Sequence, residues 1–234
     1  MDASTQALPR TERTRLHRHS ERARTSRADL YAVLDAGMIC HLGVVIDGTP
    51  VVLPTAYGRI GDTLYLHGSS ANRSIASADT REICLTVTHM DGLVCARVAF
   101  GHSINYRSAM IFGTARLVTD QAERVAGLRA VTEQLVPGRW DRLRPPSRKE
   151  LAATSVLALP LTEASVKIRT GPPKDEPADL DEPVWAGVVP VSVAFGTPEP
   201  DPALPPGTAV PGHITALRHR ANGHNGAGGT GRLA

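Results

Sequence analysis

The chain of 234 residues is 41% hydrophobic and 21% charged, and its formal net charge is only +3. So mild a charge does not by itself indicate nucleic-acid binding, and the absence of any run of about 18 apolar residues excludes a membrane-spanning helix. The start of the chain lacks an apolar signal region, and the three cysteines lack paired spacing. We therefore expect a cytoplasmic protein without a disulfide framework.

Composition divides the chain into three parts. We expect residues 1–25 to form a flexible basic leader, residues 26–192 a folded domain, and residues 193–234 a disordered tail rich in Gly and Pro. Seven arginines crowd the start of the chain: Arg10, Arg13, Arg15, Arg18, Arg22, Arg24 and Arg27. A basic arm can bind polyanions, but this one has no aromatic residue for base stacking, which argues against nucleic acid.

Hydrophobic periodicity and turn residues predict the elements in chain order. These are a helix from Ser26 to Gly37, strands over 38–46, 51–57 and 63–67, a short helix over 71–78, strands over 83–88, 93–99 and 108–118, a helix from Asp120 to Pro137, a short helix opening at Ser147, and strands over 155–159 and 166–169. Three helix starts have capping-box spacing, namely Ser26/Asp29, Asp120/Glu123 and Ser147/Glu150. Asp47-Gly48 predicts a hairpin turn, and Met90-Asp91-Gly92 suits another.

This order of elements predicts a mainly β fold with flanking helices. About six strands joined by short turns favour an antiparallel barrel over a parallel α/β sheet. No glycine fingerprint follows a strand and opens a helix, so a Rossmann dinucleotide site is not supported.

A first candidate site lies where the strand over 63–67 passes into the short helix. Backbone N–H groups at a helix start favour an anion, Ser69 adds a hydroxyl, and Arg73 adds a guanidinium. These are the parts that a phosphate monoester needs. The same residues also fit a plain helix cap beside a solvated arginine. His67 lies next to them and suits a hydrogen-bond donor that lines a pocket.

Further candidates lie later in the chain. Arg107, between Tyr106 and Ser108, could complete a dianion site, or could lie on an exposed edge. Lys167 and Arg169 share one face of the last strand, where they would meet a phosphate or solvent. Trp185 lies beyond the barrel and must pack on something, either a cofactor ring or ordinary core and dimer contacts. No pattern of paired His or Cys residues predicts a metal site, and no residue is assigned as catalytic.

Several of these segments together resemble one family. The run Thr55-Ala56-Tyr57 through Thr63-Leu64-Tyr65-Leu66-His67-Gly68-Ser69 is similar to the flavin-nucleotide-binding branch of the pyridoxamine 5′-phosphate oxidase-like family, which is related to nitroimidazole-resistance reductases. The resemblance extends in order to the following segments: Asn105-Tyr106-Arg107-Ser108, Pro137-Gly138-Arg139-Trp140, Ala153-Thr154-Ser155-Val156-Leu157, Arg169-Thr170-Gly171-Pro172-Pro173 and Trp185-Ala186-Gly187-Val188.

The resemblance implies a six-stranded antiparallel split β-barrel that forms a homodimer with FMN at the subunit interface. It places Thr55 and Tyr57 along the flavin ring, and His67 and Ser69 beside the ring or the ribityl chain. Arg73 would bind the phosphate, and Tyr106, Arg107 and Ser108 would lie nearby. Lys167, Arg169 and Trp185 would come from the partner chain. The prediction depends on Arg73 and Arg107 meeting at one phosphoryl group.

The function that follows is an FMN-dependent oxidoreductase acting on a small molecule. The flavin would carry the redox chemistry, while the protein binds and orients it. Alternatives with the same cleft are a flavin carrier without turnover, or a protein that binds haem or a deazaflavin. Authentic pyridoxamine phosphate oxidases end in an Arg-Leu-His type segment. The nearest string here, Leu217-Arg218-His219-Arg220, lies in the low-complexity tail, so oxidation of vitamin B6 is not implied.

Overall fold

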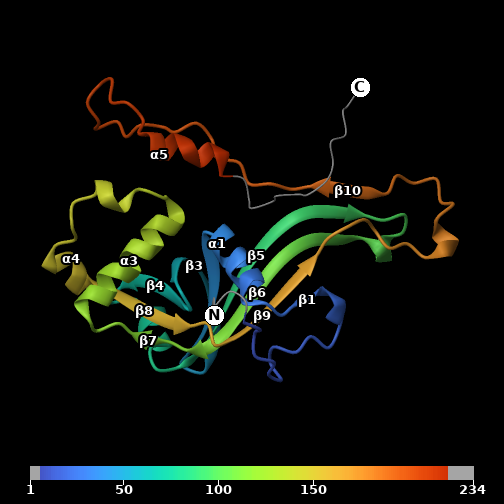
Figure 1. Ribbon diagram of the computed structural model, residues 1–234, viewed down its shortest axis with the longest axis horizontal. Coiled ribbons are helices and arrows are strands. Elements are labelled where there is room, and N and C mark those ends of the chain that lie inside the picture. The colour runs from blue at the N-terminus through green and yellow to red at the C-terminus, as the bar shows by residue number, and fades with distance from the viewer. Residues whose placement is uncertain (1–5, 221–234) are drawn as a thin grey trace.

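A computed structural model describes residues 6–220 and shows a mainly antiparallel β fold with helices at its flanks (Figure 1). The strands are β1 (Ala23–Arg24), β2 (Ile39–Ile46), β3 (Thr49–Ile60), β4 (Thr63–Ser69), β5 (Glu82–Cys95), β6 (Ser103–Thr114), β7 (Arg116–Leu117), β8 (Thr154–Pro160), β9 (Glu163–Arg169) and β10 (Gly187–Pro190). The helices are α1 (Arg27–Ala36), α2 (Arg73–Ala78), α3 (Gln121–Leu135), α4 (Arg148–Ala153) and α5 (Gly212–Thr215). Within residues 6–220, no helix has the length and apolar character needed to cross a membrane.

The ten strands form one sheet with the order β1-β9-β6-β5-β2-β3-β4-β8-β7, and β10 pairs with β5 off this path. All the pairings are antiparallel. The predicted fold class is therefore confirmed, although the strands number more than six and the sheet does not close. The β2–β3 hairpin turns at Asp47 and Gly48, whose φ values of 51° and 77° match the turn expected from these residues.

The predicted helix starts also form. Ser26 accepts a hydrogen bond from the N–H of Asp29, and Asp120 accepts one from Glu123. At Ser147 the capping box with Glu150 is reciprocal, since each side chain binds the other residue's backbone. Local side-chain chemistry therefore fixes where α1, α3 and α4 begin.

Two apolar clusters hold the layers together. The larger one joins α1 to the inner face of the sheet and includes Leu30, Leu34, Leu66 and Leu85, each no more than 1% exposed. The smaller one lies beneath α3, where Tyr65, Val131 and Val156 are buried.

The barrel splits between β3 and β4. These strands pair only from Tyr57 to Ile60 on β3 and from Thr63 to Leu66 on β4. Among the described strands, β3 pairs before Tyr57 only with β2, and the last three residues of β4 pair only with β8, which lies along the whole of β4. The two lips therefore diverge, and buried residues of α2, among them Ile75, fill the inner side of the opening.

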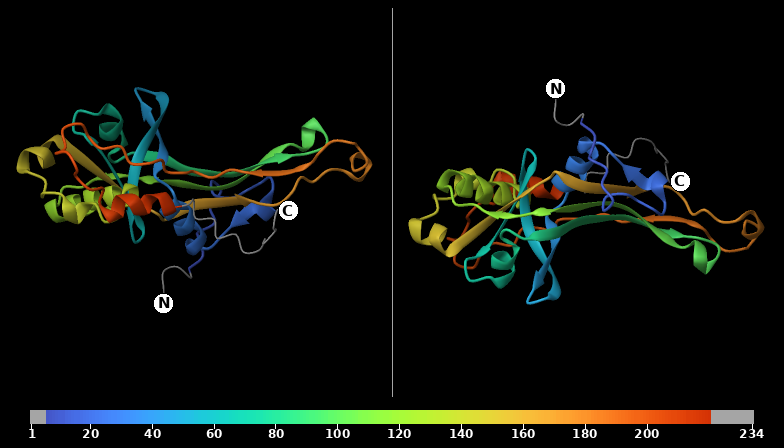
Figure 2. Two further views of the ribbon diagram at one scale, coloured as in Figure 1. Left: turned by 90° about the horizontal axis from the view of Figure 1, so that it is seen from above. Right: turned by 90° about the horizontal axis from the view of Figure 1, so that it is seen from below.

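An arm projects from the barrel in the opposite direction from α3 and α4 (Figure 2). It forms because β5, β6 and β9 continue past the barrel while β2 leaves β5 after residues 84–86, and β10 takes over the edge of β5 at residues 92–95. The expected turn at Met90-Asp91-Gly92 is wrong: β5 runs through it, and the extra residue is absorbed as a bulge between Met90 and Gly92. The chain reverses instead around a short turn at Ala99–Gly101.

In the part of the leader that the structure describes, residues 6–25, the side chains of Leu8 and Arg13 contact the domain. Leu8 is only 6% exposed and joins the larger cluster. Arg13 forms ion pairs with Glu82 and Glu163. In the tail, Arg220 donates a hydrogen bond of 2.7 Å to the carbonyl of Gln134 at the end of α3. The last 14 residues of the expected disordered tail lie outside the described residues.

Candidate cofactor site at the strand split

The β4 lip of the split borders a pocket of about 370 Å³. The floor is His67 of β4, and the opposite walls come from α3 and the segment between α3 and α4. The lining residues are His67, Leu128, Thr132, Trp140, Leu143, Arg144, Pro146 and Glu150. The pocket exists because β4 ends beneath α3, and because Gly58 of β3 has no side chain to keep α3 away.

His67 has the chemistry of a ligand rather than of a core histidine. Its Nδ1 atom is buried and has no hydrogen-bond partner within residues 6–220. Burial lowers the pKa of His67, which keeps the imidazole neutral near pH 7. A neutral imidazole can accept a proton or coordinate a metal. Within residues 6–220, no group of three or more His, Cys, Asp or Glu residues is placed to hold a metal ion.

The rim of the pocket is charged and preorganised. The guanidinium of Arg144 binds both carboxylate oxygens of Glu150 at 2.8 and 2.5 Å and holds the pKa of that carboxyl far below its ordinary value. The backbone N–H of Trp140 donates to Glu133 at 2.7 Å, which fixes the start of this segment on α3. The sequence analysis found Trp140 only as part of a family resemblance and missed its place in the pocket.

Some of the residues predicted to bind a phosphate near α2 form hydrogen bonds within the protein. Ser69 accepts a hydrogen bond from the N–H of Ala71, and Asn72 caps the helix. Arg73 donates to Asp47 at 2.6 Å, so it links α2 to the tip of the β2–β3 hairpin. Both partners are highly exposed, at 74% and 81%, and such surface pairs are weak. Arg73 can therefore exchange this partner for a phosphate.

The two predicted residues of β3 have different positions. Thr55 is half-buried opposite Cys40, on the lip of the split. Tyr57 is fully buried, and its hydroxyl donates a hydrogen bond of 2.5 Å to the carbonyl of Leu34. If Tyr57 lies along a flavin ring, as the resemblance implies, it would do so through its backbone. Apolar packing places the Tyr57 side chain in the core beneath α1.

The predicted residues of β6 lie on the arm. Arg107 makes a bidentate contact with Asp91, with both N–O distances 2.9 Å, and the two side chains are only 13% and 5% exposed. Its guanidinium is engaged inside the arm, and β6 is separated from β4 by three strands. Arg73 and Arg107 thus do not meet within one chain, contrary to the expectation. Tyr106 and Ser108 flank Arg107 and are both partly exposed.

The remaining predicted residues are also on the arm side. Lys167 pairs in register with Ser108 and is partly exposed. Arg169 is only 7% exposed, because its guanidinium binds the side chain of Asn105 and the carbonyls at the end of β9. Trp185, just before β10, is 67% exposed. The predicted site therefore divides into a split group (Thr55, His67, Ser69, Arg73) and an arm group (Tyr106, Ser108, Lys167, Trp185).

Two solved structures resemble this chain over most of its length. The flavocytochrome Anf3 from Azotobacter vinelandii is 43% identical, with a TM-score of 0.83, and the match covers 88% of this chain and 96% of that one. A protein from Mycobacterium smegmatis described as binding FAD and haem is 38% identical, with a TM-score of 0.81, and the match covers 84% and 97%.

A more distant structure shares the fold. It is a proposed 5-nitroimidazole antibiotic resistance protein from Bacteroides thetaiotaomicron, 20% identical with a TM-score of 0.54, and the match covers 62% of this chain and 86% of that one. No curated protein matches this chain. The model of the family described as pyridoxamine 5′-phosphate oxidase matches residues 26–168, more than half of the chain. With that match and a 43% identical relative, the chain belongs to the pyridoxamine 5′-phosphate oxidase family.

Proposed function

We propose that this protein is a flavocytochrome-type oxidoreductase that binds a flavin at the strand split and a haem in the adjoining pocket. The observation that carries the proposal is His67, whose buried imidazole has an unpartnered nitrogen in a pocket with largely apolar walls. The names of the two relatives, a flavocytochrome and a protein that binds FAD and haem, support the same pair of cofactors.

The residues of the pocket fit a haem. His67 would bind the haem iron through its unpartnered nitrogen, while Leu128, Trp140 and Leu143 would give the apolar surroundings that a macrocycle needs. Arg144 at the rim suits a propionate carboxylate. When bound, a haem supplies one-electron and oxygen chemistry, which the protein tunes through the axial ligand and the polarity of the pocket.

The split fits a flavin. Backbone groups of β3 before Tyr57 that face β4 have no partner on that strand, so they are available to the polar edge of a ring. Arg73 and Ser69 would bind the phosphate at the end of β4. FMN is the form expected from the sequence, whereas one relative's name states FAD. We therefore propose that the split binds a flavin, either FMN or FAD. The mass of the cofactor released from the protein will distinguish the two.

We further propose a homodimer. The outer face of the sheet carries exposed apolar side chains, including Ile39, Val45, Val52, Met90 and Met110, between 39% and 65% exposed. A contiguous apolar surface of this kind typically marks an interface. In such a dimer, the arm group of one copy would lie next to the split group of the other copy. Within a single chain the two groups are apart. The small-molecule substrate would enter between the two.

The test is the visible spectrum of the purified chain and of a matched pair of variants. Flavin absorption together with a Soret band is expected in the wild type. His67→Ala should lose the Soret band and keep its flavin, whereas His219→Ala, at an exposed position after α5, should keep both. A Soret band that persists in His67→Ala, or its absence from the wild type, contradicts the haem assignment. Flavin without reduction of any acceptor would identify a carrier instead of an oxidoreductase.

A further inference from the structure

The arginines of the leader have separate uses in the structure. Four of the seven are bound internally: Arg13 to Glu82 and Glu163, Arg22 to Glu21, Arg24 to two backbone carbonyls, and Arg27 to Asp62. Within residues 6–220, the side chains of Arg10, Arg15 and Arg18 have no hydrogen bond or ion pair. Of the four bound arginines, only Arg13 ties the leader to the domain, since Arg22 and Arg24 bind groups of the leader itself and Arg27 belongs to α1. Three guanidinium groups remain available for a ligand.

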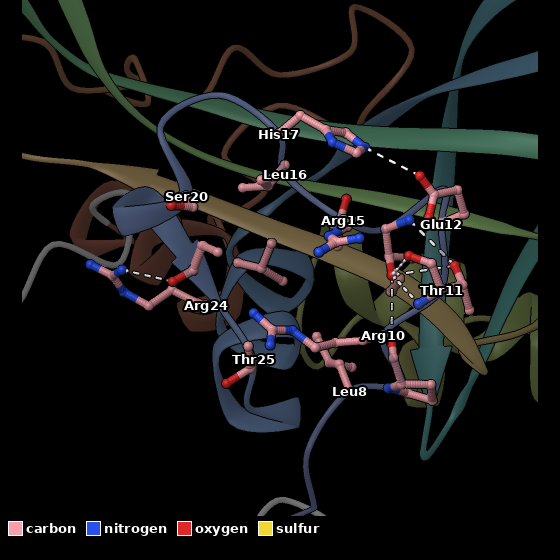
Figure 3. A pocket seen from close by; sticks show the side chains of 16 residues that line it. Leu8, Arg10, Thr11, Glu12, Arg15, Leu16, His17, Ser20, Arg24 and Thr25 are labelled. Carbon is pink, nitrogen blue, oxygen red and sulfur yellow. Dashed lines mark hydrogen bonds and ion pairs between the residues drawn. The ribbon is translucent and has the colours of Figure 1, made fainter.

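Two of these three arginines share a pocket. Arg10 and Arg15 line a cavity of about 720 Å³ between the leader and β9, and both reach toward its middle (Figure 3). Arg18 is not among the lining residues. The lining holds three arginines, Arg10, Arg15 and Arg24, and one carboxylate, Glu12, so the charge of the pocket is positive.

The other lining groups are suited to a phosphorylated organic molecule. The hydroxyls of Ser20, Thr25 and Ser165 make no side-chain hydrogen bond within residues 6–220 and can donate to phosphate oxygens. Leu16 adds an apolar wall. Planar guanidinium groups match phosphate oxygens, and a volume of this size accommodates a small ligand.

We infer that this leader pocket is a second ligand site, which binds a small organic phosphate of nucleotide size through Arg10 and Arg15. The site lies on β9 at the leader and is separate from the split between β3 and β4, so it does not depend on the proposed cofactors. Because the leader crosses the pocket, a bound phosphate would tie residues 10–25 to β9. The grouping of Arg10 and Arg15 in one pocket, with Arg18 outside it, favours a single small phosphate over an extended nucleic-acid strand.

The test is calorimetric titration of the full chain with AMP, using the protein as purified with its own flavin bound and with no free flavin added. Arg10→Ala combined with Arg15→Ala should weaken AMP binding at least tenfold, which corresponds to about 1.4 kcal/mol. Arg18→Ala is the control for a loss of leader charge outside the pocket (one charge, against two in the double variant), and should change the affinity less than twofold. Neither substitution removes a group that the fold uses, and unchanged thermal unfolding would verify this.

Three results would overturn the inference. AMP could fail to bind, the double variant could bind AMP as tightly as the wild type, or Arg18→Ala could weaken binding as much as the pocket substitutions. Inorganic phosphate should bind at least tenfold more weakly than AMP. Equal affinity would identify free phosphate as the ligand, and preferred binding of a single-stranded RNA that also depends on Arg18 would identify the leader as a nucleic-acid arm.

Discussion

Gly58 of β3 should be among the least replaceable residues of the fold, because α3 lies directly on its backbone. A Cβ atom at this position would lie 2.2 Å from the carbonyl carbon of Ala130 and 2.4 Å from the amide nitrogen of Val131. Both are backbone atoms of a helix, so no side-chain rotation can relieve the contact, and α3 must move.

The expected effect of Gly58→Ala is large for one methyl group. Overpacking of a core typically costs about 1–3 kcal/mol, and a clash with helix backbone belongs at or above the upper end. For a domain of this size, about 3 kcal/mol lowers the melting temperature by roughly 6–12 °C. The displacement of α3 should also disturb Leu128 and Thr132, and with them the pocket above His67.

Urea unfolding and thermal melts of Gly58→Ala measure this effect, with Gly113→Ala as the control. At Gly113 of β6 the nearest atom to an added Cβ is the end of the Leu159 side chain, at 3.2 Å, which can yield. The control should stay within about 1 kcal/mol of the wild type, since alanine also favours a strand over glycine. An ordinary surface substitution changes the free energy of unfolding by about 0.5 kcal/mol or less. If the free energy of unfolding of Gly58→Ala lies within this range of the wild-type value, the described packing of α3 on β3 is refuted.

Three further substitutions test other parts of the structure. Tyr57→Phe should lower the free energy of unfolding by about 0.5–1.5 kcal/mol, the value of one hydrogen bond, and leave the flavin content unchanged; loss of flavin would place the Tyr57 side chain at the cofactor site. Arg107→Ala should lower the free energy of unfolding in urea by about 3–5 kcal/mol, because it breaks a buried ion pair. Adding Asp91→Ala to the same chain should recover part of this loss. Equal stability of the wild type and Arg107→Ala would contradict the pairing. Burial lowers the pKa of His89 in the folded chain. As the pH falls below the ordinary histidine pKa of about 6.5, the unfolded chain therefore takes up a proton at this residue before the folded chain does. The free energy of unfolding should then fall by up to about 1.4 kcal/mol per pH unit. His89→Asn should show a smaller loss between pH 7 and pH 5 in urea midpoints, and an equal loss in both proteins would exclude His89 as the cause.

The sequence by itself determined the features that depend on a few neighbouring residues. Ser26, Asp120 and Ser147 start helices because each side chain reaches a backbone N–H within one turn. Asp47-Gly48 makes the hairpin because both residues accept positive φ. Alternating apolar residues placed β5 in the sheet, with one face buried.

The tertiary structure decided everything that depends on contacts between distant segments. Asp91-Gly92 has the composition of a turn, but β5 continues through it as a bulge paired with β6, and Arg107 of β6, which pairs with His89, binds the Asp91 carboxylate. Leu8 brings the leader into the core, which no local pattern in a basic segment indicates.

The candidate site shows the same division. The sequence singled out His67 as a residue of the strand end, but its role depends on α3 and the following segment closing over β4. It also suggested that Arg73 and Arg107 meet, although the strand order separates them by placing β5, β2 and β3 between β6 and β4. Residue types and local spacing determine which groups are available, whereas only the pairing order of the strands determines which of them come within reach of one another.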